Sequence, residues 1–507
     1  MTRRFTVIVF IGVLVAVRSP VRAGDPLKLL DPPQGQFADD WMLLMLGDEK
    51  VGYANSTITR NGDTITARML TVFSIARADN KVEISMLQTA EETVDGHPRE
   101  FESATKMGIV ETRTRGVIAD GKVKLSTTQF GQTTDQTSEF PPGAVMTWGS
   151  YRITIEKGFA PGTTYDIDVY EPAMSAEKPI RAHFEVGEKK TIDVLGKQRE
   201  AVEIRSTLST PQGEMPSVSY VDDKGNPLRV EVQIAGLKMT MVAADREIAL
   251  REFNPPEFFV DTLVPVDRSL DRGTLAAVDY TIRVNGAGRK LPPLPPTAMQ
   301  TPGESDAQSA KLRVRRVDTR ALRDAPIVPP SEELNEFLVS SASINSKDPA
   351  IIEMAANAAG DETRPYYVAD RLRTHVTDII KEKSLAVGFG TASEVCRNRE
   401  GDCTEHAVLL AALGRARGIP TRVVVGLAYV PSFAGKTNVF GFHMWTQFNI
   451  AGQWIDLDAA LRETDCSPAR IALATSGLND VGIGEIAFAI MDVITGLKIE
   501  IVAVEER

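Results

Sequence analysis

The chain has 507 residues, of which 43% are apolar and 25% are charged, and this is the composition of a soluble globular protein. The length exceeds that of one ordinary domain, so two or three domains are expected. The formal net charge of −11 and the absence of a basic run argue against binding to nucleic acid or to an anionic membrane surface.

Residues 1–23 have the pattern of a secretory signal peptide. Arg3 and Arg4 form a basic start, and residues 5–17 are uncharged and mostly apolar. This run of 13 residues is shorter than the roughly 20 that span a bilayer, and Ala23 ends a suitable cleavage site. We therefore expect cleavage after Ala23, a mature protein with no transmembrane helix, and a periplasmic or extracellular location.

Residues 24–258 are expected to form a β-rich N-terminal domain. Short segments alternate polar and apolar residues, as half-buried strands do, and turn-forming pairs such as Asn61-Gly62 and Asp120-Gly121 separate them. The apolar face of such a sheet must be covered. We therefore expect a large antiparallel sheet that is curved, forms an open barrel, or divides into two β-modules.

A small β-rich segment with a proline-rich linker is expected at residues 259–328. Residues 279–284 and 311–317 have the composition of strands. Between them, residues 292–296 predict a stiff extended spacer, and residues 301–306 predict a polar loop.

Residues 329–507 form the last predicted domain, and it begins with helices. The signals for helix starts and ends predict a helix capped by Ser331, one that starts at Asp348-Pro349 and ends at Gly360, one over residues 365–383, and a short one over residues 391–398.

A further, very apolar helix follows Gly401-Asp402-Cys403. Gly401 permits a tight turn and Asp402 can cap the helix, which places Cys403 in its first turn. The helix is apolar on nearly every face up to Gly418, so it should be buried. The positive end of the helix dipole favours a nucleophilic thiolate, whereas a charged Asp402 opposes it. An imidazolium near the thiol would therefore be needed as well.

Two strands that follow this helix carry the residues that we expect to act with the thiol. If Ala451-Gly452 is a two-residue turn, Trp445 faces Asp458, and His443 is the diagonal neighbour of Asp458 on the same face. Such a register brings an imidazole and a carboxylate together.

Two other residues compete for these roles. Asp456 lies on the same face as Asp458 but opposite Gln447, farther from His443. His406 lies one turn deeper in the helix than Cys403, so it is less able to face a thiol at the helix tip. We therefore predict Cys403, His443 and Asp458 as the site residues.

Cysteine, histidine and aspartate in this arrangement are the groups that acyl transfer through a thioester requires. A lone buried cysteine or a lone strand histidine is usually structural. Here all three residues fall within 56 positions, and it is this combination that favours a catalytic site.

The motifs resemble the core of the transglutaminase-like superfamily, in particular exported bacterial members with a long β-rich N-terminal region. The resemblance covers residues 331–474 and rests on the segments 401–403, 415–424, 443–445 and 452–458. It implies an α+β fold with a papain-related core. In such a core Cys403 attacks an amide, His443 acts as base and then as acid, and Asp458 orients His443.

Two positions depart from the family pattern. Ala459 follows the aspartate where the family commonly has proline, and no tryptophan occurs between Trp148 and Trp445 to help hold an oxyanion. The Cys403 amide is then one oxyanion donor, and the second is unassigned. No acidic cluster implies calcium, and the five histidines show no metal-ligand spacing, so no cofactor or metal is expected.

These features predict an exported cysteine-dependent enzyme that acts on a protein or peptide substrate, with the cell envelope as one source. Peptide or isopeptide hydrolysis and transglutaminase-type cross-linking differ in whether water or an amine resolves the thioester. The alternative is a non-catalytic binding or assembly protein that uses the transglutaminase-like module as a scaffold. The presence of all three site residues counts against this alternative.

Three cysteines are too few for a disulfide framework in an exported chain of this length. Their odd number leaves at least one thiol free unless two chains pair. One arrangement joins Cys396 to Cys466 and leaves Cys403 free.

Overall fold

The computed structural model describes residues 30–77, 80–107, 110–129, 132–171, 178–210, 213–234, 237–257, 260, 262–286, 289–326, 331–381, 390–478 and 493–507. The predicted signal peptide lies outside these residues. The chain divides into two compact units, one with residues up to 76 and 81–256, the other with residues 77–80 and 257–507. Among the helices described, none has the length and apolar character needed to cross a membrane.

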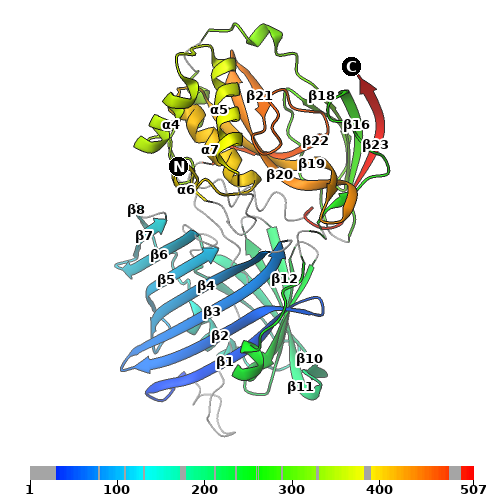
Figure 1. Ribbon diagram of the computed structural model, residues 1–507. Coiled ribbons are helices and arrows are strands. Elements are labelled where there is room, and N and C mark those ends of the chain that lie inside the picture. The colour runs from blue at the N-terminus through cyan, green and yellow to red at the C-terminus, as the bar shows by residue number, and fades with distance from the viewer. Residues whose placement is uncertain are drawn as a thin grey trace. The chain divides into compact units, whose positions relative to one another are not determined.

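The first unit is built on one antiparallel sheet of fourteen strands (Figure 1). They are β1 (Gly35–Leu46), β2 (Glu49–Asn61), β3 (Thr64–Arg77), β4 (Asn80–Thr93), β5 (Pro98–Met107), β6 (Val110–Ala119), β7 (Lys122–Gln129), β8 (Gln132–Glu139), β9 (Thr164–Val169), β10 (Ile180–Val194), β11 (Lys197–Thr210), β12 (Gly213–Val221), β13 (Pro227–Ile234) and β14 (Leu237–Ala244). Strands β1 to β8 form a meander, and β14 to β9 continue from the other side of β1. The predicted large antiparallel sheet is confirmed.

The sheet curves around helix α1 (Thr147–Lys157). Trp148 of α1 packs with Phe37 and Ile58 of β1 and β2, while Met146, just before the helix, packs with Phe101 of β5. A flat sheet could not bring strands this far apart to one short helix. The sequence analysis expected only strands here and missed α1, because its aromatic and β-branched residues favour strands. A second, short helix, α2 (Arg246–Leu250), follows β14.

The second unit contains two antiparallel sheets. The five-stranded sheet comprises β15 (Val264–Pro265), β19 (Thr421–Phe433), β20 (Lys436–Ile450), β21 (Gln453–Leu457) and β22 (Arg470–Ser476). Its order is β15-β20-β19-β22, with β21 paired to β20. The four-stranded sheet has the order β17 (Gln300–Ser305), β18 (Ser309–Arg315), β16 (Leu275–Val284) and β23 (Leu497–Glu506).

Helices cover one face of the five-stranded sheet (Figure 1). The α-helices are α4 (Pro349–Ala359), α5 (Pro365–Ile379), α6 (Ala392–Asn398) and α7 (Cys403–Ala416), and the 3-10 helices η2 (Arg320–Leu322) and η3 (Glu332–Phe337) precede them in the chain. Helix α7 lies between the sheet and helices α4, α5 and α6, and its Leu409 and Leu413 are fully buried. This confirms the prediction of a buried helix after Gly401-Asp402-Cys403.

The predicted helix ends are mostly those observed. Asp348 caps α4 by accepting a hydrogen bond from the Ala350 N–H, and Thr391 caps α6. The helix expected over residues 365–383 ends at Ile379, and residues 382–389 lie outside the described part of the chain. The helix expected after Ser331 is the 3-10 helix η3, and the Ser331 side chain makes no capping hydrogen bond, so that prediction was wrong.

The segment 259–328 differs from expectation in two respects. Residues 301–306 were predicted as a loop, but most of them form edge strand β17, where Pro302 is tolerated because an edge strand need not donate every N–H. Strand β16 also pairs with β23 from the C-terminus, and Tyr280 packs against Phe440 of the five-stranded sheet. Residues 257–507 therefore share one compact unit.

Candidate active site

The start of α7 is held by the carboxyl groups of Asp402 and Glu405. The Asp402 side chain accepts a hydrogen bond from the Thr404 N–H at 2.9 Å, and Glu405 accepts one from the Asp402 N–H at 2.9 Å. These reciprocal bonds form a capping box, which fixes Cys403 as the first residue of the helix. At Gly401 the backbone has a φ of +146°, and a Cβ there would lie 2.3 Å from the Cβ of Glu405. Only glycine fits this turn.

Glu405 is a residue that the sequence analysis missed. Its carboxylate is fully buried and also accepts a hydrogen bond from the Gly390 N–H at 2.9 Å. Burial, together with the neighbouring Asp402, raises the pKa of Glu405 to about 8. Its position three residues after a capping aspartate was the available signal.

The hairpin of β20 and β21 has the predicted register. Thr446 pairs with Leu457 and Gln447 pairs with Asp456, so Asp458 follows directly on the face that carries His443. The Nε2 atom of His443 lies 2.7 Å from the Oδ2 atom of Asp458. Their side chains are 10% and 0% exposed, so bulk water does not weaken this bond.

The Cys403 thiol lies near enough to the His443 imidazole to influence its charge. Burial opposes a charge on the imidazole, but Asp458 and then Cys403 outweigh it and raise the pKa of His443 to about 10. Burial likewise opposes the charge on Asp458, but His443 and Arg470 hold its pKa well below the usual range. The histidine and aspartate therefore form an imidazolium–carboxylate pair at neutral pH. The structure thus brings Cys403, His443 and Asp458 together.

The two competing residues have other partners. Oδ1 of Asp456 accepts hydrogen bonds from Trp445 Nε1 at 2.5 Å and from Gln447 Nε2 at 3.0 Å. Burial raises the pKa of Asp456. His406 is buried in α7 with its Nδ1 atom 2.6 Å from the Asp402 carbonyl oxygen.

Arg470, at the start of β22, is a second residue that the sequence analysis missed. Its Nη1 donates to Asp458 Oδ2 at 3.3 Å, and its Nη2 donates to Glu463. The guanidinium also lies 5.0 Å from the ring centre of Trp445, on which the His443 ring stacks. Its only sequence signal was a lone basic residue at the start of an apolar strand.

All three cysteines are free thiols. Cys396 donates weakly to the Ala350 carbonyl oxygen and Cys466 to that of Glu463, both at 3.8 Å. These two residues belong to separate hydrophobic clusters, so the suggested Cys396–Cys466 disulfide is wrong. Within the described residues, no group of three or more His, Cys, Asp or Glu could hold a metal ion.

A comparison with curated proteins finds no match. One similar solved structure is a provisionally assigned cysteine protease from Cytophaga hutchinsonii, with 16% identity, coverage of 46% of this chain and 85% of that chain, and a TM-score of 0.29. Another is a β-barrel-like protein with a domain of unknown function from Brucella abortus, with 12% identity, coverage of 42% and 96%, and a TM-score of 0.32.

A third structure is a provisionally assigned protease from Parabacteroides distasonis, with 11% identity, coverage of 73% of this chain and 69% of that chain, and a TM-score of 0.20. The family model of the transglutaminase-like superfamily matches residues 352–459, which include Cys403, His443 and Asp458. The resemblance to the transglutaminase-like superfamily that the sequence predicts is therefore confirmed over residues 352–459.

Proposed function

We propose that the protein is an exported cysteine-dependent enzyme that transfers the acyl group of an amide through a thioester. One observation carries the proposal: the Nε2 atom of His443 lies 2.7 Å from Oδ2 of Asp458, and Cys403 at the start of α7 interacts with the same imidazole. Three residues in these mutual positions have the geometry of a nucleophile, a base and a group that orients the base.

The proposed reaction begins from a thiolate–imidazolium pair, in which His443 holds the proton given up by the Cys403 thiol. Since Nε2 is bonded to Asp458, Nδ1 is the ring nitrogen that exchanges this proton. The sulfur attacks the amide carbonyl carbon, and the resulting imidazolium protonates the amine as the C–N bond breaks. The acyl group is left on the sulfur as a thioester. The Cys403 N–H, at the first position of α7, is one donor to the oxyanion, because helix starts leave N–H groups without intrahelical acceptors.

The thioester is then resolved by a nucleophile that His443 deprotonates. Attack by water gives hydrolysis of a peptide or isopeptide, and attack by an amine gives cross-linking; both release the Cys403 thiol. We place hydrolysis first, with a protein or peptide of the cell envelope as the substrate. Export rests on the pattern of residues 1–23, and sequencing the N-terminus of the protein from the producing cell tests it. A mature chain that still carries residues 1–23 would contradict cleavage.

Thiol reactivity tests the proposed nucleophile. At neutral pH, iodoacetamide should alkylate Cys403 far faster than the buried Cys396 and Cys466, as followed by peptide mass spectrometry. Because Cys403 is also the most exposed of the three, His443→Gln is the matched control, since it removes the base and keeps the cysteine in place. If Cys403 reacts equally fast in the wild type and in this variant, the thiol is not activated and the proposal fails.

Product analysis separates the outcomes of the reaction. A cell-envelope extract is treated with the wild type or with Cys403→Ala, and hydrolysed, deamidated and amine-linked peptides are scored separately. The proposal predicts one product class that depends on Cys403. The alternative of a non-catalytic scaffold predicts none, together with unchanged function of Cys403→Ala in the cell.

A further inference from the structure

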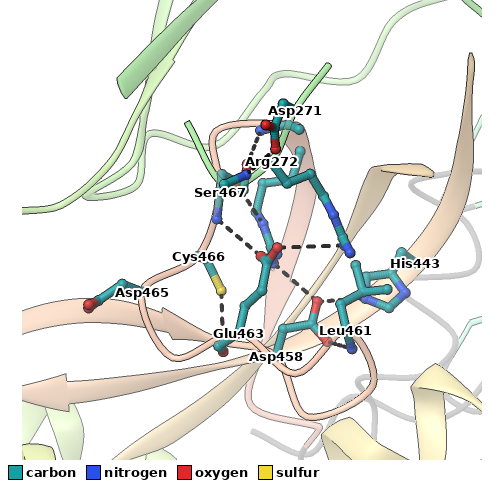
Figure 2. Close-up of polar contacts among 12 residues, drawn as sticks. Asp271, Arg272, His443, Asp458, Leu461, Glu463, Asp465, Cys466 and Ser467 are labelled. Atoms are coloured by element: carbon teal, nitrogen blue, oxygen red, sulfur yellow. Dashed lines mark hydrogen bonds and ion pairs between the residues drawn. The ribbon is translucent and has the colours of Figure 1, made fainter. Parts of the chain in front are cut away.

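An ionic cluster continues from the buried Asp458 into the loop that leads to β22. Arg470 donates to Asp458 and to Glu463, and the Glu463 carboxylate also accepts from the Ser467 N–H at 3.1 Å. Arg272 lies 3.5 Å from Glu463 (Figure 2). The cluster thus alternates in charge from Asp458 through Arg470 and Glu463 to Arg272.

We propose that Arg470 is a positioning residue for the acyl-transfer reaction, which fixes Asp458 as a carboxylate directed at His443 and is itself held by Glu463. This inference rests on the proposed function.

The contacts of Asp458 leave its carboxylate one orientation. Oδ2 lies between His443 Nε2 at 2.7 Å and Arg470 Nη1 at 3.3 Å, while Oδ1 accepts from the Leu461 N–H at 2.8 Å. Rotation of the carboxylate would break all three bonds. Arg470 therefore controls both the direction and the charge of the group that His443 faces.

Burial of the Arg470 guanidinium costs desolvation free energy, which its ion pairs with Asp458 and Glu463 must offset. The side chain is 3% exposed, and apolar residues of similar volume often stabilise a core at least as well as a buried ion pair does. The indole ring of Trp445 contacts both the Arg470 guanidinium and the His443 imidazole, and these contacts fix the positions of the two groups relative to each other. This arrangement suits an electrostatic role better than a purely structural one.

The four-stranded sheet and its flanking segments hold the loop that carries this cluster. The Tyr280 hydroxyl of β16 donates to the Pro468 carbonyl at 3.0 Å, and Arg316, just after β18, donates to the Asp465 carbonyl at 2.6 Å. Gln300 of β17 exchanges hydrogen bonds with the backbone of Ala472 at 2.9 and 2.8 Å. Through these bonds the segment 259–328 supports the position of Asp458.

Several charged and titratable groups determine how the pair of Asp458 and His443 responds to pH. They come from different elements of the second unit: Cys403 of α7, Asp456 of β21, Glu463 and Cys466 of the loop, Arg470 of β22, and Arg272 before β16. Arg470 is the cation bonded directly to Asp458. Its removal should raise the pH at which the pair takes up protons, and removal of the Glu463 charge should lower it.

The test measures the pH dependence of Cys403 alkylation in the full chain. Arg470→Gln should move the acid limb of the rate profile to higher pH by about one unit or more. Glu463→Gln should move it to lower pH, and Arg470→Lys, which keeps the charge, should shift it less than Arg470→Gln does. Arg415→Gln is the matched control, because Arg415 is a buried arginine whose hydrogen bonds, among the described residues, go to backbone carbonyls. It should lower stability and leave the limb in place.

Removing a positive charge at Arg470 and a negative charge at Glu463 should shift the acid limb in opposite directions. Lost packing alone would not reverse the direction of the shift, so the two variants distinguish an electrostatic effect from a packing effect. If Arg470→Gln and Glu463→Gln move the limb in the same direction, or if Arg470→Gln does not move it, the positioning role is overturned while the proposed function stands. If wild-type Cys403 reacts no faster than in His443→Gln, the proposed function fails instead. In that case an NMR titration of the His443 imidazole, which needs no reactive thiol, decides the role of Arg470. A His443 pKa that rises in Arg470→Gln and falls in Glu463→Gln supports the role, and a His443 pKa that is unchanged in Arg470→Gln overturns it.

Discussion

At the scale of single residues, two aspartates on one face of β21 and its extension have different environments. Asp458 bonds His443 through Oδ2, whereas Asp456 accepts both of its hydrogen bonds at Oδ1, and its Oδ2 has no hydrogen-bond partner among the residues that the structure describes. An amide nitrogen can take the place of Asp456 Oδ2 without losing an accepted bond. At Asp458 both oxygens accept hydrogen bonds, so an amide nitrogen must displace a donor.

We predict that Asp458→Asn slows alkylation of Cys403 at pH 7 by about 100-fold, since an amide stabilises no imidazolium. Asp456→Asn should leave the rate within about threefold, because its contacts with Trp445 and Gln447 lie outside the proton path. Alkylation rates by mass spectrometry check both variants, with thermal unfolding as the control for folding. Equal losses in the two variants would mean that Asp458 has no special role.

Sequence reasoning went furthest where one short turn determines many positions. The pair Ala451-Gly452 sets the register of β20 and β21, and the register selects Asp458 over Asp456 for His443. Arg470 was missed because its role depends on how a loop folds, and Glu405 was missed although its spacing from Asp402 was a local signal. Glu405 bonds Gly390, and Arg470 bonds residues that only the folded loop brings near.

At the scale of elements, α1 shows how a distant strand can supply a helix cap. Met146 at the N-cap position has no side-chain capping bond. The buried Glu92 at the end of β4 accepts instead from the N–H groups of Trp148 at 2.5 Å and Gly149 at 2.9 Å. The capping residue is more than fifty residues away from its helix in the sequence, so no local sequence pattern predicts this cap.

Glu92 should make the first unit less stable as the pH rises. Burial raises its pKa from 4.5 to about 7, although the backbone hydrogen bonds partly oppose the shift. The folded state therefore holds this proton more tightly than the unfolded chain does. The contribution is complete below pH 4.5 and is lost by about pH 7, which lowers the free energy of unfolding by about 3 kcal/mol.

Urea unfolding of the full chain at several pH values checks this prediction, with hydrogen exchange of α1 peptides as the local readout. Glu92→Gln should remove this pH dependence and lower stability at pH 4.5, because the amide nitrogen faces a backbone N–H. Exposed Glu111→Gln, on β6, serves as the control and should retain the dependence. Equal stability of wild-type α1 at pH 4.5 and pH 8 would rule out a buried proton on Glu92.

The turn between β20 and β21 is a second element with a defined cost. Ala451 and Gly452 have φ values of 51° and 83°, as a hairpin turn with two left-handed residues requires, and alanine is strained there. Ala451→Asn should stabilise the second unit by about 0.5–1 kcal/mol. In α4 the exposed Ala356→Asn should instead destabilise it by about 0.5 kcal/mol. Chemical denaturation of both variants checks the contrast, and a loss of stability in Ala451→Asn would show that the turn is not strained.

At the scale of the whole molecule, local patterns indicated the class of each region but not which regions share a core. The alternation over residues 24–258 predicted the large sheet, and the caps predicted α4, α6 and α7. The pairing of β16 with β23 joins segments about 200 residues apart, and strand composition does not reveal partners at that distance. The predicted division at residue 329 therefore separates β16 from β23, although these two strands pair in the same sheet.

This connection makes a prediction about fragments. A fragment of residues 329–507 lacks β16, so β23 loses its neighbour in the four-stranded sheet, and Phe440 and Ile471 lose the apolar cover that includes Tyr280. We expect this fragment to aggregate or to unfold without a cooperative transition. A fragment of residues 257–507 keeps the complete unit and should unfold cooperatively.

Circular dichroism during heating, together with the alkylation rate of Cys403, compares the two fragments with the full chain. The fragment of residues 257–507 should alkylate Cys403 at the wild-type rate within about twofold. The reason is that every contact given above for Cys403, His443, Asp458 and Arg470 lies within this unit. A compact domain that contains all contacts of its site can fold and keep that site alone. A cooperative, fully reactive fragment of residues 329–507 would show that the four-stranded sheet is dispensable. Since that sheet holds the loop between Asp458 and Arg470, such a result would also remove its proposed support of the site.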